Sequence, residues 1–467
     1  MTEQLSTTFN TLREAWLQHR PDKRQRREDL LRLRAAFKAS LPQMTEAISR
    51  DFGHRSAHES MLAEAMIVLK EIDNCLHKLK KWMKPQRRKA GWQFWPAKAE
   101  IRFVPLGVVG ILSPWNYPVN LSLTPLISAI AAGNHVFLRP SEHTPHTNAY
   151  LTRLLHDCFP QNRVRIIQGG ADIAAAFSNL PFDHLFFTGS TAVGKKVMAA
   201  AAKNLTPVTL ELGGKSPALI APDADLTKTV SRILTGKLFN AGQTCIAPDY
   251  VLLPENQLET FIAECQSQTA QRYNEANGQT DYTAIINESQ YKRLTGLADD
   301  ASIRGHKVIP LLSLNDTQKA ENRHILPPML VINPDDDSAI MQEEIFGPLL
   351  PVKTYRSYDE ALRYIIDRDR PLAFYIFSSS NEPVENALSN VVAGSVCIND
   401  TLYQFACADL PFGGVGMSGM GHYHGEEGFK TFSKVMPVLR KYNPAATDYL
   451  RPPYGRFADT LIRFLTK

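Results

Sequence analysis

Cys245 lies in a short glycine-containing segment whose setting suits nucleophilic catalysis. The segment reads Phe239-Asn-Ala-Gly-Gln-Thr-Cys-Ile-Ala-Pro-Asp-Tyr250. A helical apolar pattern precedes it, at Leu226, Val230, Ile233, Leu234 and Leu238. A strand-like run from Tyr250 to Leu253 follows it. A thiol between a helix and a strand can point into a cleft, and its thiolate is a strong nucleophile. The alternative is a small buried apolar residue, the commoner fate of a free cysteine.

Glu211 is the second candidate, because it ends a strand-like run that reads Val-Thr-Leu and is followed by two glycines. A carboxylate within an apolar frame has a raised pKa and is suited to act as a general base. An exposed glutamate at the end of a strand fits the same spacing equally well.

Asn116 is the third candidate, in a proline-bounded loop between Trp115 and Tyr117. Its side-chain amide can join the backbone N–H of Cys245 in stabilising an oxyanion. The same residue type in such a loop is otherwise explained as a turn residue.

Two further loops are suited to a nucleotide. One follows an apolar strand and opens a helix, so its backbone N–H groups can receive a phosphate; it comprises Gly189, Ser190, Thr191, Ala192, Val193 and Gly194. It is not a Gly-x-Gly-x-x-Gly motif, and a tight turn is the alternative. Arg139 and Glu142, after an earlier strand, are suited to the hydroxyls of an adenosine ribose; a surface cation and a carboxylate at a helix N-terminus are the alternative.

The elements that must position these residues alternate from residue 101 onward. The predicted strands are Val108–Leu112, His135–Leu138, Val164–Ile167, His184–Phe187 and Val208–Leu210. The predicted helices between them are Leu121–Ala132, Asn148–Cys158, Asp172–Leu180 and Val193–Lys203. Strand, helix, strand in this order predicts a parallel sheet with helices on its faces. Ligands bind past the carboxyl ends of such strands, so the candidate loops should gather at one edge.

Composition and charge bound the class of protein. A chain of 467 residues exceeds the size of a single core and predicts two or more domains. The net charge of +5 is small for this length, and no nucleic-acid recognition motif accompanies the basic stretches. Six scattered cysteines indicate a reducing compartment and no disulfide scaffold. We expect no metal site, and we assign the pair His422 and His424 to a loop.

The two ends of the chain have their own patterns. Residues up to 84 are predicted to be helical, and the basic, tryptophan-rich segment up to Pro96 is either a bridging arm or an exposed loop. The amphipathic end has apolar residues at Phe457, Leu461, Ile462, Phe464 and Leu465. We expect it to pack on its own fold rather than on a membrane. With no signal-like N-terminus and no apolar run of spanning length, a cytoplasmic location is expected.

Taken together, these stretches resemble the aldehyde dehydrogenase superfamily. The motifs that carry the resemblance are Phe-Asn-Ala-Gly-Gln-Thr-Cys245, Glu211-Leu-Gly-Gly-Lys, Pro-Trp-Asn116-Tyr-Pro, Phe-Thr-Gly-Ser190 and Glu-Glu344-Ile-Phe346-Gly-Pro. They span roughly residues 100 to 430. The finer similarity is to the class-three, fatty-aldehyde and coniferyl-aldehyde branch, through Cys245-Ile-Ala-Pro-Asp-Tyr250 and Gly-Met-Gly-His-Tyr-His-Gly425.

The resemblance implies an oxidoreductase that uses NAD, with NADP possible, and converts an aldehyde into the acid through a thioester on Cys245. It implies that Glu211 activates water, that Asn116 holds the oxyanion, and that Glu344 holds the nicotinamide ribose. Phe346 would support the nicotinamide ring, Ser190 and its loop would face the phosphates, and Trp115 is included among the cofactor contacts. The expected substrate is an aromatic aldehyde of the coniferyl type or a medium or long aliphatic one.

The resemblance also implies an α/β fold with three parts. A Rossmann-type parallel-sheet NAD-binding domain would comprise residues 1–84 and 104–213, and an α/β catalytic domain residues 214–418. Residues 85–103 and 419–467 would form a small bridging arm for oligomerisation, with a homodimer expected. The chain departs from the family in having Arg139 where lysine is usual, which leaves NADP open, although Glu142 should repel a 2′-phosphate. An acyl-CoA-linked relative and a non-catalytic scaffold are the alternatives.

Overall fold

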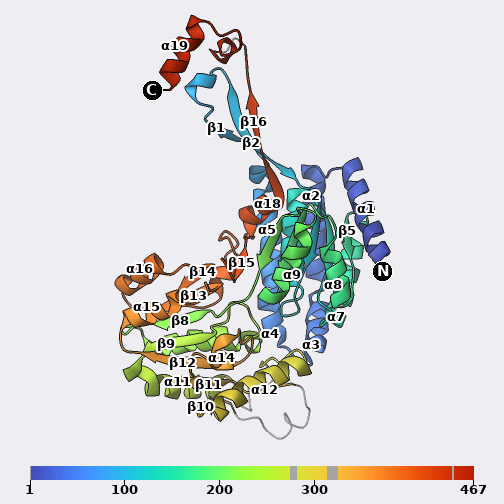
Figure 1. Ribbon diagram of the computed structural model, residues 1–467. Coiled ribbons are helices and arrows are strands. Elements are labelled where there is room, and N and C mark those ends of the chain that lie inside the picture. Colours follow the sequence, from blue (N-terminus) through green and yellow to red (C-terminus); the bar gives the residue numbers. More distant parts are fainter. Residues whose placement is uncertain (1, 274–280, 313–323, 444–445, 467) are drawn as a thin grey trace.

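The computed structural model describes residues 2–273, 281–312, 324–443 and 446–466. Two large sheets with their helices form the body, and a narrow arm extends away from it (Figure 1). The N-terminal helices lie against the first sheet, whereas the C-terminal helix lies at the far end of the arm.

The first sheet contains the strands predicted between residues 101 and 213. Its six strands run in the order β15-β7-β6-β3-β4-β5. The parallel strands are β3 (Val108–Leu112), β4 (His135–Arg139), β5 (Val164–Ile166), β6 (His184–Thr188) and β7 (Val208–Glu211). The edge strand β15 (Gly419–Met420) is antiparallel to β7 and pairs Gly419 with Glu211. The predicted parallel sheet is therefore confirmed, and its nearly continuous apolar strands follow from burial on both faces.

Helices cover both faces of this sheet. On one face, α1 (Thr2–Gln18), α8 (Ala171–Ser178) and α9 (Thr191–Ala202) share an apolar cluster with the strands. On the other face lie α6 (Asn120–Ala132) and α7 (Pro145–Cys158), backed by α2 (Lys23–Ala39), α3 (Leu41–Phe52) and α5 (Ile67–Trp82). Between α3 and α5 stand the short helix α4 (Ala57–Ser60) and the π-helix η1 (Met61–Met66).

The second sheet has seven strands in the order β10-β11-β12-β9-β8-β13-β14. They are β8 (Pro217–Ile220), β9 (Tyr250–Pro254), β10 (Lys307–Pro310), β11 (Met329–Ile332), β12 (Leu349–Tyr355), β13 (Ala373–Phe377) and β14 (Ser395–Ile398). All neighbours are parallel except β10 and β11. Its helices are α10 (Leu226–Leu238), α11 (Leu258–Arg272), α12 (Glu288–Ile303), α14 (Ala339–Gln342), α15 (Tyr358–Ile366) and α16 (Asn381–Asn390). The cysteine segment joins α10 to β9, as the pattern predicts.

The arm is a three-stranded antiparallel sheet of β1 (Gln86–Arg88), β2 (Lys98–Pro105) and β16 (Ser433–Arg440), with α19 (Arg456–Leu465) beyond it. The amphipathic end was expected to pack on its own fold, and that expectation is wrong for most of its apolar side chains. Phe457 and Phe464 are 59% and 64% exposed. Phe464 touches Trp92, with ring centroids 5.6 Å apart. The arm stands clear of the body, so it has no core that could bury α19.

Among the described residues, no helix combines the length and apolar character of a membrane span.

Candidate active site

The predicted loops meet at the carboxyl edge of the first sheet. Asn116 follows β3, Arg139 ends β4, Ser190 follows β6 and Glu211 ends β7. The glycine-rich segment around β15 packs beside β7, where the Leu212 N–H donates to the Ser418 carbonyl at 3.1 Å. The parallel register therefore brings together residues that are 21 to 95 positions apart in the chain.

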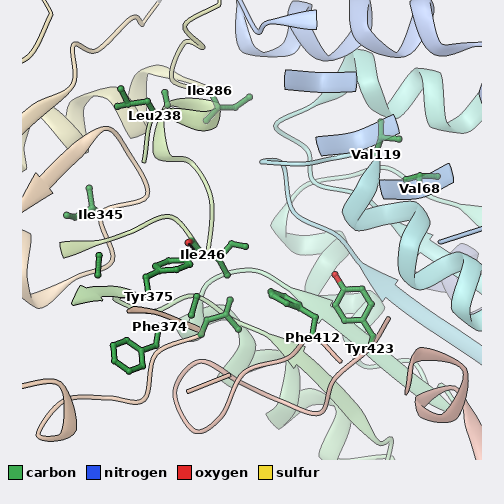
Figure 2. Packing of buried hydrophobic residues seen from close by; sticks show 14 of the residues in the cluster. Val68, Val119, Leu238, Ile246, Ile286, Ile345, Phe374, Tyr375, Phe412 and Tyr423 are labelled. Carbon is green, nitrogen blue, oxygen red and sulfur yellow. Dashed lines mark hydrogen bonds between the residues drawn. The ribbon is translucent and has the colours of Figure 1, made fainter. Parts of the chain in front are cut away.

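Cys245 is partly buried and follows a tight left-handed turn. Asn240 and Ala241 have φ angles of 54° and 51°, and Gly242 has 73°. A Cβ on Gly242 would lie 2.3 Å from the Gly347 carbonyl oxygen, so no larger residue fits there. On the other side of the cysteine, the Tyr375 hydroxyl donates to the Ile246 carbonyl, and Figure 2 shows these two residues side by side. The segment is thus held on both sides of the sulfur.

Asn116 lies against this turn. Its side-chain Nδ2 donates to the Gln243 carbonyl at 3.1 Å, and the hydroxyls of Tyr117 and Thr244 are 2.6 Å apart. Asn116 is 2% exposed, so it is not a surface turn residue. The structure therefore brings the candidate oxyanion donor and the candidate nucleophile into adjoining loops, as predicted.

Burial raises the pKa of the Cys245 thiol, and the nearby carboxyls of Glu344 and Glu211 raise it further. The backbone N–H groups of Cys245 and Ile246 act in the opposite direction, because they favour the thiolate. The resting form at neutral pH is therefore the thiol, and a base must take its proton before the sulfur can attack.

Glu211 is 3% exposed, which excludes the alternative of an exposed residue at a strand end. Neither carboxylate oxygen has a hydrogen-bond partner among the described residues. Burial therefore raises the pKa of Glu211 well above its usual value. The negative charge of Glu211 also raises the pKa of Tyr423, as does that of Cys245. An unpartnered carboxylate beside the nucleophile is the arrangement expected of a general base.

The loop after β6 presents the start of α9 to this edge. Ser190 precedes the helix and its side chain makes no capping hydrogen bond. That side chain therefore leaves the first backbone N–H groups of α9 free to donate hydrogen bonds to a bound anion. Thr191 donates from its hydroxyl to the Met417 carbonyl at 3.1 Å, which ties the loop to the glycine-rich segment.

Arg139 is 6% exposed and is not the surface cation of the alternative interpretation. Its Nη2 donates to the Glu142 carboxylate at 2.7 Å and to the carbonyls of Gly169 and Gly170. The Arg139 charge and hydrogen bonds lower the pKa of Glu142 against a partial burial that raises it, so this exposed carboxylate stays ionised. The Arg139 guanidinium, the candidate partner for a 2′-phosphate, is engaged with its own chain, while the Glu142 carboxylate, which would repel that phosphate, is exposed.

Glu344 and Phe346 lie across from Trp115. A Cβ on Gly213 would lie 1.9 Å from the Glu344 carboxylate, so the glycine makes room for that side chain. Burial raises the pKa of Glu344 to about 8, and Asp249 raises it further, while the Gly214 N–H, Lys215 and Arg293 lower it. The rings of Trp115 and Phe346 meet edge to face, 5.4 Å between centroids. A carboxylate acceptor and an aromatic wall beside the cysteine suit a ribose and a flat ring.

Two aromatic residues that follow β14, Tyr403 and Phe405, differ in their surroundings. Tyr403 is 63% exposed. Phe405 lines a small cavity whose other walls are Ile67, Lys70, Glu71, Thr124, Ala406, Ala408 and His424. The His424 Nε2 has no partner in the part of the chain that is described. Tyr423, next to His424, faces Phe412 within the core (Figure 2).

Among the described residues, no cluster of three or more potential metal ligands occurs.

Several buried polar residues around the site were missed by the sequence analysis. They are Arg55, Glu59, Glu64, Lys237 and Gln243. Burial lowers the pKa of Lys237 to about 8, whereas Asp249 and Glu344 oppose this shift. One signal was available: Glu64 and Glu71 interrupt the apolar stripe that also contains Val68, Ile72 and Cys75. A charged residue on the buried stripe of a helix requires a partner elsewhere in the fold.

The site combines a partly buried cysteine, an unpartnered buried carboxylate and an amide donor with a helix N-terminus at the carboxyl edge of a parallel sheet. This combination is typical of a nucleotide-dependent enzyme. A family-wide sequence comparison matches residues 10–438 to the Aldehyde dehydrogenase family. The chain belongs to this family, and it is an NAD(P)-dependent aldehyde dehydrogenase.

The similar proteins include members of the branch predicted from the sequence. The chain is 48% identical over 460 residues to a probable coniferyl aldehyde dehydrogenase of Pseudomonas aeruginosa, covering 98% of this chain and 95% of that one. It is 42% identical over 466 residues to the coniferyl aldehyde dehydrogenase of a Pseudomonas species, covering 99% and 96%. Among solved structures, the substrate-bound state of Staphylococcus aureus AldH matches with a TM-score of 0.93 and 38% identity over 99% of both chains.

Proposed function

We propose that Cys245 is the nucleophile of this dehydrogenase, that Asn116 and the Cys245 N–H hold the oxyanion, and that Glu211 is the general base. Cys245 transfers its thiol proton to Glu211, and the sulfur bonds to the aldehyde carbon. The carbonyl oxygen then becomes an oxyanion beside Asn116. The bound nicotinamide supplies the acceptor for the hydride that leaves this carbon. A thioester on Cys245 remains, and Glu211 loses the first proton to solvent. The Glu211 carboxylate then deprotonates the water that hydrolyses the thioester, which releases the acid and frees the Cys245 sulfur.

The observation that carries this assignment is the Glu211 carboxylate, buried without a partner beside Cys245. An isolated buried carboxylate destabilises a fold, so its presence indicates a function. A ribose contact at Glu344, a ring contact at Phe346 and Trp115, and a phosphate site at the start of α9 complete the proposed cofactor contacts. The proposed NAD-binding domain comprises residues 1–84 and 104–213, and the proposed catalytic domain comprises residues 214–418. The two large sheets support this division.

We propose an aromatic aldehyde of the coniferyl type as the substrate. The names of the two Pseudomonas relatives support this choice.

A panel of aldehydes tests the substrate and the cofactor together. With NAD, coniferyl aldehyde should give a kcat/KM about 2- to 13-fold above that of hexanal or decanal, since aromatic contacts of its ring are favourable by about 0.5 to 1.5 kcal/mol. NADP should give a lower kcat/KM than NAD, because Glu142 repels a 2′-phosphate. The acid should form without coenzyme A. A preference for decanal would overturn the aromatic assignment, and a requirement for coenzyme A would favour the acyl-CoA-linked alternative.

We also propose a homodimer formed through the arm, located in the cytoplasm. The arm exposes apolar side chains that a monomer would leave in water: Trp92, Trp95, Val435, Leu439, Phe457 and Phe464. Six free cysteines are consistent with a reducing compartment.

Light scattering after size exclusion should report a dimer for the full chain. Val435→Glu with Leu439→Glu should shift the mass toward the monomer, because two charges per copy would enter an apolar interface. Leu205→Glu is the matched control, since Leu205 is 89% exposed and lies between α9 and β7, outside the arm strands. A monomeric wild type, or a dimer unaffected by the arm variant, would contradict the proposal.

A further inference from the structure

Two buried carboxylates of the segment formed by α4 and η1 contact the loops that carry Asn116 and Cys245. Glu59 is 8% exposed and Glu64 is fully buried. They lie five residues apart, and i→i+5 hydrogen bonds close a π-helical turn. Such turns are rare and occur often at functional sites. Neither glutamate has a part in the chemistry described above.

Glu64 holds the loop that carries Asn116. Its Oε2 accepts hydrogen bonds from the N–H groups of Val119 at 3.1 Å and Asn120 at 2.6 Å. Its Oε1 accepts from Arg55 Nη1 at 3.2 Å. The same nitrogen donates to the backbone carbonyl of Asn116 at 3.0 Å. One buried ion pair therefore fixes the Asn116 carbonyl and the backbone three and four residues after it.

Arg55 adds a second contact to this loop. Its guanidinium lies over the Tyr117 ring, 4.8 Å from the centroid. Its side chain is fully buried, and its Nε and Nη2 have no hydrogen-bond partner in the described ranges. A buried charge that is only partly paired is costly, so stability alone does not account for it.

Glu59 holds the turn that precedes Cys245. Its Oε2 accepts from the backbone N–H of Asn240 at 3.1 Å and from the Thr283 hydroxyl at 2.7 Å. Asn240 has a left-handed backbone, which persists only where surrounding contacts impose it. The Asn240 Nδ2 in turn donates to the Asn116 carbonyl at 3.1 Å. The Asn116 carbonyl oxygen thus accepts hydrogen bonds both from Arg55 and from the turn that precedes Cys245.

We propose that Arg55, Glu59 and Glu64 are positioning residues, which set the Asn116 amide relative to the Cys245 sulfur. The inference rests on the proposed function of these two residues and names what holds them in place. Because Arg55 and Asn240 share the Asn116 carbonyl, a shift of either loop moves the oxyanion donor away from the nucleophile. A displacement of about 1 Å is enough to slow a reaction about 10²-fold without unfolding the protein.

Arg55→Met and Glu59→Ala test the proposal in the full-length enzyme with NAD and aldehyde. Each should lower kcat by about 10- to 100-fold and change the KM for NAD much less, because the proposed phosphate and ribose contacts at the start of α9 and at Glu344 lie outside the loops that move. Glu59→Gln keeps an acceptor oxygen and should restore kcat to within about threefold of wild type. Asn116→Ala by itself should lower kcat by about 10²- to 10³-fold.

The double variant Arg55→Met with Asn116→Ala distinguishes positioning from general weakening. If Arg55 acts through Asn116, the pair should be no slower than Asn116→Ala alone. Arg163→Met is the matched control, since Arg163 forms another buried pair, with Asp29 of α2 at 2.7 Å. It should lower the melting temperature and leave kcat within about twofold.

Additive losses in the double variant, or unchanged kcat in folded Arg55→Met and Glu59→Ala, would overturn the proposal. If Arg55→Met does not fold, the comparison of Glu59→Ala with Glu59→Gln decides, and equal kcat in the two would count against it. Cys245→Ala separates the two levels of inference. If that variant remains active, the proposed function fails; if it is inactive while the positioning variants turn over normally, only the positioning role fails.

Discussion

Replacing Cys245 by alanine is expected to abolish aldehyde-dependent formation of reduced NAD, with kcat/KM falling by about 10⁴-fold or more. Removal of a covalent nucleophile leaves only the residual effect of binding and the oxyanion donors. The measurement is absorbance at the reduced-nicotinamide band with coniferyl aldehyde. Binding of NAD, followed by quenching of protein fluorescence, should stay within about threefold of wild type, because Cys245 contributes little to cofactor affinity.

Cys407→Ala is the control for this experiment, since Cys407 is also a free thiol but is exposed and takes no part in the site. Its turnover should match that of the wild type. Iodoacetamide should inactivate the wild type by labelling Cys245, and inactivation should accelerate as pH rises, because burial raises the pKa of this thiol and only the thiolate reacts. Undiminished turnover in the alanine variant would remove the basis of the mechanism.

Replacing Glu211 by glutamine is expected to slow both halves of the reaction, because the same carboxylate accepts the Cys245 proton and activates water. Reduced NAD should form more slowly than in the wild type, up to about one equivalent per subunit, and the steady-state rate should then be lower by about 10²- to 10⁴-fold, since the glutamine amide cannot deprotonate water. Rapid mixing followed by mass spectrometry of the quenched protein should detect the acyl group on Cys245. Steady-state rates that remain high would show that another group activates the water.

The pH dependence gives a second readout for Glu211. Only its carboxylate form can accept a proton, and burial raises its pKa, so the rate of thioester hydrolysis in the wild type should increase with pH through that raised pKa. The rise should lie at higher pH than for an exposed glutamate and should be absent in Glu211→Gln. Asp183→Asn is the control, because Asp183 also has a pKa raised by burial but precedes β6, at the opposite edge of the sheet. Its profile should match that of the wild type.

The sequence by itself determined the order of strands and helices and the chemical groups between them. The periodicity of apolar residues predicted β3, β4, β6 and β7 to within one residue at their ends, because periodicity is a local property of the chain. The alternation of these strands with helices allowed only a parallel sheet, and that topology places Asn116, Ser190 and Glu211 at one edge.

Tertiary structure alone decided the burial and the partners of these groups. Nothing in the spacing distinguished a buried Glu211 from an exposed one, or an Arg139 engaged with Gly169 and Gly170 from a free cation. The contacts of Asn240 with Glu59 and with Asn116 join residues 181 and 124 positions apart. Such contacts depend on how helices dock onto a finished sheet, and no local pattern encodes that docking. The exposed apolar face of α19 was likewise mispredicted, because amphipathicity shows that a helix needs a partner but not where the partner lies.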